Sequence, residues 1–156
     1  ASGLGANVDQ AFGYRSESLR FADSDVFENN LPNPVSGGLV GQLPTGTGIL
    51  LIGHDRAYVE DNSVIDNDYA GLVVVDHCVV TGATDEDCAP DGNTIVRNTI
   101  TGNGTNPTED NPFKDLASDV IVIAPGTGNC MADNTYDTHV GADGIEAESC
   151  PPFAGF

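Results

Sequence analysis

Short runs of apolar, mostly β-branched residues alternate with turn-forming residues along most of this chain. Residues 49–52, 72–75 and 120–123 consist only of Ile, Leu and Val, and Gly, Asp or Pro lies close to both ends of each run. Long stretches with apolar residues at spacings of three and four, which predict amphipathic helices, are missing. Apolar runs between turns are typical of buried strands, so the sequence predicts an all-β fold.

A nine-residue frame recurs along the chain. An apolar residue stands three positions before an Asn, another stands two positions after it, and a second Asn follows at the fifth position. The frame occupies residues 59–67, 95–103 and 131–139, with a looser copy at 21–29. Its first Asn is Asn62, Asn98 and Asn134, at intervals of 36 residues, and His139 stands where the last second Asn is expected. Four copies of one frame indicate a solenoid.

One uninterrupted turn of this solenoid runs from Gly48 to Gly71 and holds three short strands, at 49–52, 58–60 and 63–65. Parallel strands stack roughly 4.8 Å apart, so residues at one frame position form columns. The expected inward columns are Phe21, Val59, Ile95 and Met131, and Val26, Val64, Ile100 and Tyr136. Asn tolerates the left-handed backbone of a bend and bonds to neighbouring backbone groups, so the Asn62, Asn98 and Asn134 column is predicted to be structural.

The repeats resemble those of right-handed parallel β-helix proteins. Residues 62–67 and 98–103 are similar to repeats of the pectate-lyase-like superfamily, which also includes periplasmic copper-processing proteins. Residues 128–138 resemble the C-terminal part of secreted bacterial β-helix proteins of unassigned function. The resemblance implies an all-β, right-handed parallel β-helix of about four rungs.

We expect a single β-helix domain over residues 1–156. Residues 1–17 form an irregular or partial rung, 18–139 form the rungs with inserted loops at 31–47, 79–92 and 104–117, and 140–156 form a C-terminal tail. The first 17 residues contain no capping helix, although the open end of a solenoid exposes apolar groups and unpaired strand edges. The N-terminal end is therefore expected to continue into a longer solenoid or to be covered by a protein partner.

The chain is strongly acidic, with a formal net charge of −19 and five basic residues, namely Arg15, Arg20, Arg56, Arg97 and Lys114. Such a surface repels phosphate backbones and anionic membranes, so nucleic-acid binding is not expected. The sequence contains no transmembrane run, so membrane insertion is not expected either. A solvated acidic surface suited to a salty exterior accounts for the same charge.

Four cysteines favour an oxidising compartment. Cys78 and Cys88 bracket an insertion, and Cys130 and Cys150 bracket the C-terminal segment. Three pairings are open, and we favour these two local ones because each closes a loop. Each disulfide would contribute roughly 3 kcal/mol in the loop-entropy model.

Enzymes with the β-helix fold that this chain resembles are mostly polysaccharide lyases, hydrolases and epimerases, with sites on the outer face of one sheet. A lyase needs a base and positive charge to neutralise a uronate, and a hydrolase needs paired carboxylates. The candidates for such roles are Arg56 with Asp55 and Asp61, and Arg97 with Asp133. No motif of those enzymes matches residue by residue.

No cofactor is expected, and Zn²⁺, Cu²⁺ and Ca²⁺ are the candidate ions. Counted from Gly48 and Gly71, His54 and His77 occupy the same position, so their imidazoles would stack roughly 5 Å apart at the backbone. With Asp55 and Asp76 they would suit Zn²⁺ or Cu²⁺. A surface His pair without metal is the alternative. Candidate calcium ligands lie in a second cluster, Asp85, Glu86, Asp87 and Asp91, whose alternative is a solvated loop.

These features favour an extracytoplasmic scaffold that is secreted, periplasmic or on the cell surface. It would act as a structural or a protein- or glycan-binding element, without catalysis by these residues. Two alternatives remain open: a fragment of a polysaccharide lyase or glycoside hydrolase, and a periplasmic metal-handling protein.

Overall fold

The computed structural model describes residues 19–82, 84 and 88–153. The chain is mostly β, with 34% of residues in strands and 10% in helices, and every strand pair is parallel. The expected parallel all-β architecture is therefore confirmed. The predicted irregular segment 1–17 lies outside the described residues.

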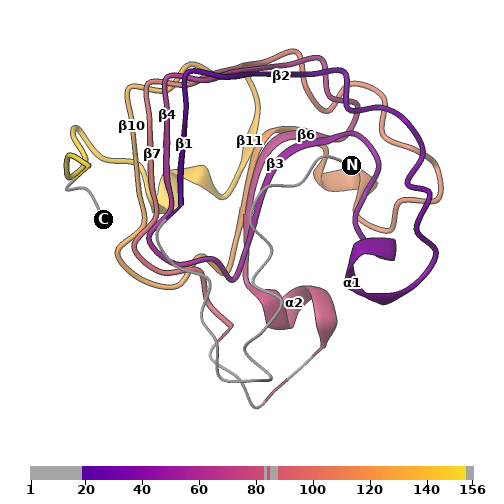
Figure 1. Cartoon of the computed structure of the whole chain (residues 1–156). Helices are drawn as coiled ribbons and strands as arrows, with labels where there is room; N and C mark the ends of the chain where they lie inside the picture. The colour runs from indigo at the N-terminus through magenta and orange to yellow at the C-terminus, as the bar shows by residue number, and fades with distance from the viewer. Residues whose placement is uncertain (1–18, 83, 85–87, 154–156) are drawn as a thin grey trace.

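Three parallel sheets make up the molecule. The first contains β1 (Arg20–Ala22), β4 (Tyr58–Glu60), β7 (Thr94–Val96) and β10 (Cys130–Ala132). The second contains β2 (Asp25–Phe27), β5 (Ser63–Ile65) and β8 (Thr99–Thr101). The third contains β3 (Thr47–Ile52), β6 (Ala70–Val75), β9 (Ser118–Ile123) and β11 (His139–Val140). The chain visits the sheets in a fixed order, so strands from successive repeats stack side by side (Figure 1).

The strand register confirms the inward columns. Pairing aligns Phe21, Val59, Ile95 and Met131 in the first sheet, and Val26, Val64 and Ile100 in the second. Tyr136 completes the second column from outside a strand, partly buried against the core. Its neighbour Thr135 forms a parallel bridge with Thr99. The core therefore consists of columns of apolar side chains, one column at each inward frame position.

Gly48 and Gly71 are the second residues of equivalent strands, and no side chain fits at either position. A Cβ on Gly71 would lie 2.4 Å from the Ile100 Cγ2 atom and 2.7 Å from the Asn103 Nδ2 atom. A Cβ on Gly48 would lie 2.6 Å from the Gly71 carbonyl oxygen. The two glycines thus allow the chain to pass closely between the second and third sheets.

The third sheet is buried on both faces, which explains its uninterrupted apolar runs. Inward residues such as Leu51, Leu72 and Val74 join the main core. Outward residues such as Leu50 and Val73 join a second apolar cluster. The insertions carry short helices that lie beyond this sheet, on the side away from the first sheet (Figure 1).

Short helices occur in the insertions and near the C-terminus. They are α1 (Gly38–Gly41), α2 (His77–Thr81), η2 (Lys114–Leu116) and η3 (Ala142–Gly144). The Asp76 carboxylate caps α2 by accepting hydrogen bonds from the N–H groups of Cys78 and Val79. The helix ends at Gly82, whose φ of 73° suits a residue without a side chain. The second insertion thus starts at α2, two residues before the predicted loop 79–92.

Both disulfides have the predicted pairing. The Cys78–Cys88 disulfide joins α2 to the segment before β7, and the Cys130–Cys150 disulfide ties the C-terminal tail to β10. In the tail, the Phe153 ring packs 5.2 Å from that of Tyr58 on the first sheet. Two disulfides indicate an oxidising setting. Within the described residues, no helix has the length and apolar character to cross a membrane.

The register predicts that a charge at an inward position unfolds the chain. Val64→Asp and Ile100→Asp should each lower the free energy of unfolding by at least about 4 kcal/mol, because a carboxylate would enter the core without a partner. Ile65→Ser and Thr101→Ser are the controls, since both side chains are only partly buried. Urea unfolding followed by circular dichroism measures the difference. Equal stability of the Asp variants and the controls would refute the register.

Candidate functional site

The predicted Asn column forms a continuous hydrogen-bonded array, here called the first Asn ladder. The Asn98 Oδ1 atom accepts from the backbone N–H of Asn62 at 3.0 Å and from its side-chain Nδ2 at 2.9 Å. The Asn134 Oδ1 atom likewise accepts from the backbone N–H and the side-chain Nδ2 of Asn98, at 2.9 Å for both bonds. The Asn98 Nδ2 also donates to the carbonyl of Val59 in the preceding repeat at 3.0 Å. Each amide therefore binds the backbone of two repeats.

A second Asn ladder follows the second sheet and contains Asn29, Asn67 and Asn103. Here Asn67 bonds to the Oδ1 atom of Asn103 through its N–H at 3.1 Å and its Nδ2 at 2.8 Å. The last position, where the sequence has His139, is filled by the buried carboxylate of Asp119. Its Oδ1 atom accepts from the Asn103 N–H at 2.8 Å, and its Oδ2 atom accepts from the Thr138 N–H at 3.0 Å.

A third Asn ladder, of Asn93 and Asn129, lies at the turn before the first sheet. The Asn93 Oδ1 atom accepts from the Ala57 N–H at 2.7 Å, and the Asn129 Oδ1 atom accepts from the Asn93 N–H at 2.9 Å. This ladder did not emerge from the sequence because the frame was aligned on the other two turns. The 36-residue interval between Asn93 and Asn129 was the available signal.

Two predicted site residues belong to this same turn. The buried carboxylate of Asp55 accepts from the Asp91 N–H at 2.9 Å. The Asp91 Oδ1 atom accepts from the N–H of Thr127 at 2.6 Å and from its hydroxyl at 3.2 Å. Both carboxylates therefore hold backbone of the next repeat, whether they were predicted as catalytic or as calcium ligands. The other calcium candidates, Asp85, Glu86 and Asp87, lie outside the described residues.

The residue before each Asn of the first ladder has left-handed backbone. The φ angles are 52° at Asp61, 55° at Arg97 and 56° at Asp133. These side chains project from the same bend in successive repeats. The bend therefore determines the position of three of the predicted catalytic candidates.

An ion-pair cluster lies on the outer side of the first sheet. The Arg97 Nη2 atom contacts Glu60 at 2.5 Å and Asp61 at 2.8 Å, while its Nε donates to Asp61 at 2.9 Å. Arg20 contacts the same Glu60 at 2.5 Å. The hydrogen bond from Arg97 lowers the pKa of Asp61, and the same contact, with that to Glu60, raises the pKa of Arg97.

The ion pairs in this cluster differ from the predicted pairing of Arg97 with Asp133. Arg97 is bound to Asp61 and Glu60, and among the described ion pairs none joins it to Asp133. Arg56 is exposed, with left-handed backbone, and its N–H donates to the Asp91 carbonyl at 2.8 Å. The lowered pKa of Asp61 makes it a poor general acid, because the hydrogen bond from Arg97 stabilises its charged form.

The predicted His pair lies just beyond the regular pairing of the third sheet. Regular pairing ends at Ile52 with Val75, and the chain then leaves the sheet at His77, whose N–H donates to the Cys88 carbonyl at 3.0 Å. The His54 carbonyl instead accepts from the Nδ2 of Asn93 at 2.7 Å. The insertion starts at His77, so the stacking of the two imidazoles stays a prediction.

Two of the candidate metal ligands, Asp55 and Asp76, accept hydrogen bonds from backbone N–H groups. His54 is buried, and burial lowers its pKa although the nearby Asp55 charge acts in the opposite direction. Among the described residues, the one group of three ligand-type side chains is Asp76, Cys78 and Cys88. Both of those sulfur atoms are joined in a disulfide, and the carboxylate caps α2. This group therefore does not have the chemistry of a metal site.

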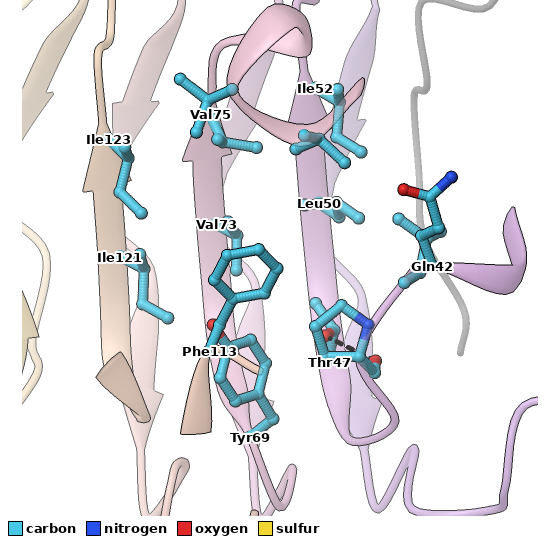
Figure 2. Close-up of a pocket in the computed structure, with 14 residues that line it drawn as sticks. Gln42, Thr47, Leu50, Ile52, Tyr69, Val73, Val75, Phe113, Ile121 and Ile123 are labelled. Atoms are coloured by element: carbon cyan, nitrogen blue, oxygen red, sulfur yellow. Dashed lines mark hydrogen bonds between the residues drawn. The ribbon is translucent and has the colours of Figure 1, made fainter. Parts of the chain in front are cut away.

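An apolar depression, here called the outer groove, lies over the third sheet. Its floor consists of Leu50, Ile52, Val73, Val75, Ile121 and Ile123, whose side chains point to the same side (Figure 2). Its walls come from all three insertions, through Leu43 and Pro44, Val79 and Val80, and Phe113. The cavity volume is about 50 Å³.

Tyr69 stands at one end of the outer groove, below the ring of Phe113 in Figure 2. Burial raises the pKa of Tyr69 to about 12, so its hydroxyl stays protonated at neutral pH. The lining residues include no charged side chain. The groove can therefore receive an apolar group, but it has no residues for acid–base chemistry near pH 7. The apolar run 72–75, too continuous for a half-solvated strand, was the sequence signal for this covered face.

Comparisons with models of known families, with curated proteins and with solved structures find no match for this chain. A functional proposal must therefore be drawn from the residues themselves.

The first Asn ladder makes a direct prediction for stability. Asn98→Ala should lower the free energy of unfolding by about 3 kcal/mol, because buried donors and acceptors of two neighbouring repeats lose their partner. Thr99→Ala is the control, since this adjacent side chain is exposed, and it should change stability by less than about 0.5 kcal/mol. Urea denaturation measures both. Similar values for the two variants would show that the ladder contributes little.

Proposed function

We propose that this chain is a right-handed parallel β-helix of the pectate-lyase-like kind, located outside the cytoplasm, that acts as a rigid structural and binding scaffold. Support for the solenoid comes from three parallel sheets visited in fixed order and from amide ladders that join successive repeats at the turns. Support for the location comes from the two disulfides, since such bonds persist in oxidising compartments.

The observation that carries the scaffold function is the use of polar side chains to hold backbone. Asp55, Asp91 and Asp119 accept hydrogen bonds from backbone N–H groups of other repeats. Asp61 and Glu60 are engaged by arginines. These carboxylates are engaged in hydrogen bonds and ion pairs within the stack of repeats. The hydrogen bond from Arg97 lowers the pKa of Asp61, whereas the general acid of a glycoside hydrolase needs a raised pKa.

Binding is favoured over a purely structural role by the placement of the insertions. All three contribute walls to one groove on the third sheet, although they are far apart in sequence. A rigid stack that presents variable loops on one face is a common arrangement for recognition. The inserted loops are therefore proposed as the part of the scaffold that contacts a protein or glycan.

A glycan-active enzyme is the second candidate because Arg20 and Arg97 lie together on the outer side of the first sheet. Two cations at one surface could neutralise a uronate. Glu60 lies between them, however, and contacts each arginine at 2.5 Å. Its charge offsets the attraction that a uronate carboxylate would experience.

The scaffold and the enzyme differ in what happens to a bound polysaccharide. The immobilised protein is incubated with pectin, alginate and neutral polysaccharides and with extracellular proteins, and retention and product release are both measured. The scaffold should retain at least one ligand chemically unchanged. Unsaturated product that is lost in Arg97→Ala or Arg56→Ala would establish the enzyme instead, and failure to retain any ligand would contradict the binding role.

A further inference from the structure

The outer groove has the chemistry of a socket for one aliphatic side chain. No lining side chain is charged, and the Thr47 hydroxyl already donates to the Pro44 carbonyl at 3.0 Å (Figure 2). The cavity volume of about 50 Å³ exceeds the roughly 10–15 Å³ that a single water needs, so an apolar group larger than water can enter. A branched aliphatic side chain fits this description.

The rim of the groove exposes apolar side chains to solvent. Val79 is 49% exposed on one side and Phe113 is 38% exposed on the other. The position of Phe113 is fixed by its backbone N–H, which donates to the Asn111 Oδ1 atom at 2.8 Å. Exposed apolar side chains held at the edge of a socket are typical of a surface that another molecule covers.

A second depression continues from the groove across Pro44, which lines both. It has a volume of about 400 Å³ and is lined in part by Val35, Asn111 and Pro112. Asn111 is only 6% exposed, and its Nδ2 atom is buried with no hydrogen-bond partner among the described residues. A buried amide donor that lacks an acceptor costs free energy. The second depression thus has a polar residue in its lining, next to the apolar groove.

The charge of the chain selects the partner. The formal net charge is −19, Asp110 lines the second depression, and Asp76 caps the helix that bears Val79. A basic segment is attracted to such a surface, and an acidic one is repelled. A second copy of this chain carries the same charge and is therefore a poor occupant.

We propose that the outer groove and the adjoining depression bind an extended, basic segment of a partner protein that inserts one Leu or Val side chain into the groove. This assignment rests on the proposed role as a binding scaffold, and it adds the location and the chemistry of the partner.

The test uses a labelled heptapeptide in which a central Leu is flanked by Gly on each side and by two Lys at each end. Fluorescence polarisation measures its affinity for the whole chain. The central Leu should matter, so that a Gly replacement weakens binding about tenfold or more. Replacing the four Lys by Glu should abolish binding, and raising the salt concentration should weaken it.

Variants of the rim locate the site. Val79→Asp and Phe113→Ala should each weaken binding of the Leu peptide about tenfold. Phe27→Ala is the matched control, because Phe27 is 57% exposed but lies on the second sheet, and it should leave the affinity unchanged. Circular dichroism confirms that each variant is folded.

Three outcomes would overturn the assignment. They are equal affinity for the Leu and Gly peptides, an equal effect of Phe27→Ala and the rim variants, and no binding of the basic Leu peptide. A concentration-dependent dimer that disappears in Val79→Asp would assign the groove to a second copy instead. If the peptide fails while a polysaccharide or another protein is retained unchanged on the immobilised chain, the groove assignment is wrong and the scaffold function stands.

Discussion

The structure depends on hydrogen bonds from Asn side chains that join one repeat to the next at each turn. Parallel strands satisfy their backbone groups within the sheets, but at the bends some N–H groups, such as that of Asn62, are bound by a side chain instead. The amide of Asn98 is such a side chain, because it accepts from Asn62 and donates to the carbonyls of Val59 and Val96. Buried backbone groups that lack partners are costly, so these amides allow a tightly coiled chain to turn with its bends inside the protein.

Much of this arrangement could be predicted from sequence because the stack repeats at a fixed interval. The inward columns and the first Asn ladder follow from spacings of 36 and 38 residues. The carboxylate of Asp119 could not be predicted in this way, since it meets Asn103 from only 16 residues along the chain. Equal spacing from Gly48 and Gly71 is a weaker guide for His54 and His77, because an insertion interrupts the repeat at His77. The walls of the outer groove come from three separate insertions, whose packing over the sheet no local pattern specifies.

The same division separates the stack of repeats from the walls of the outer groove. Residues that recur with the repeat, including Asp55 and Asp91, hold the backbone. Residues that interrupt the repeat form the walls of the groove, with Val79 and Phe113 at its edges. The Cys78–Cys88 disulfide links these two parts, since it fastens the helix that carries Val79 to the segment before β7.

Amide hydrogen exchange measured by NMR tests most directly whether the ladders hold the turns as firmly as the sheets hold the strands. The side-chain and backbone amide protons of Asn62, Asn98, Asn67 and Asn103 should exchange as slowly as those of Val64 and Ile100, because they would open only when the whole stack unfolds. Exchange of the Asn amides at the rate of exposed loop residues, while the strands remain protected, would contradict this account.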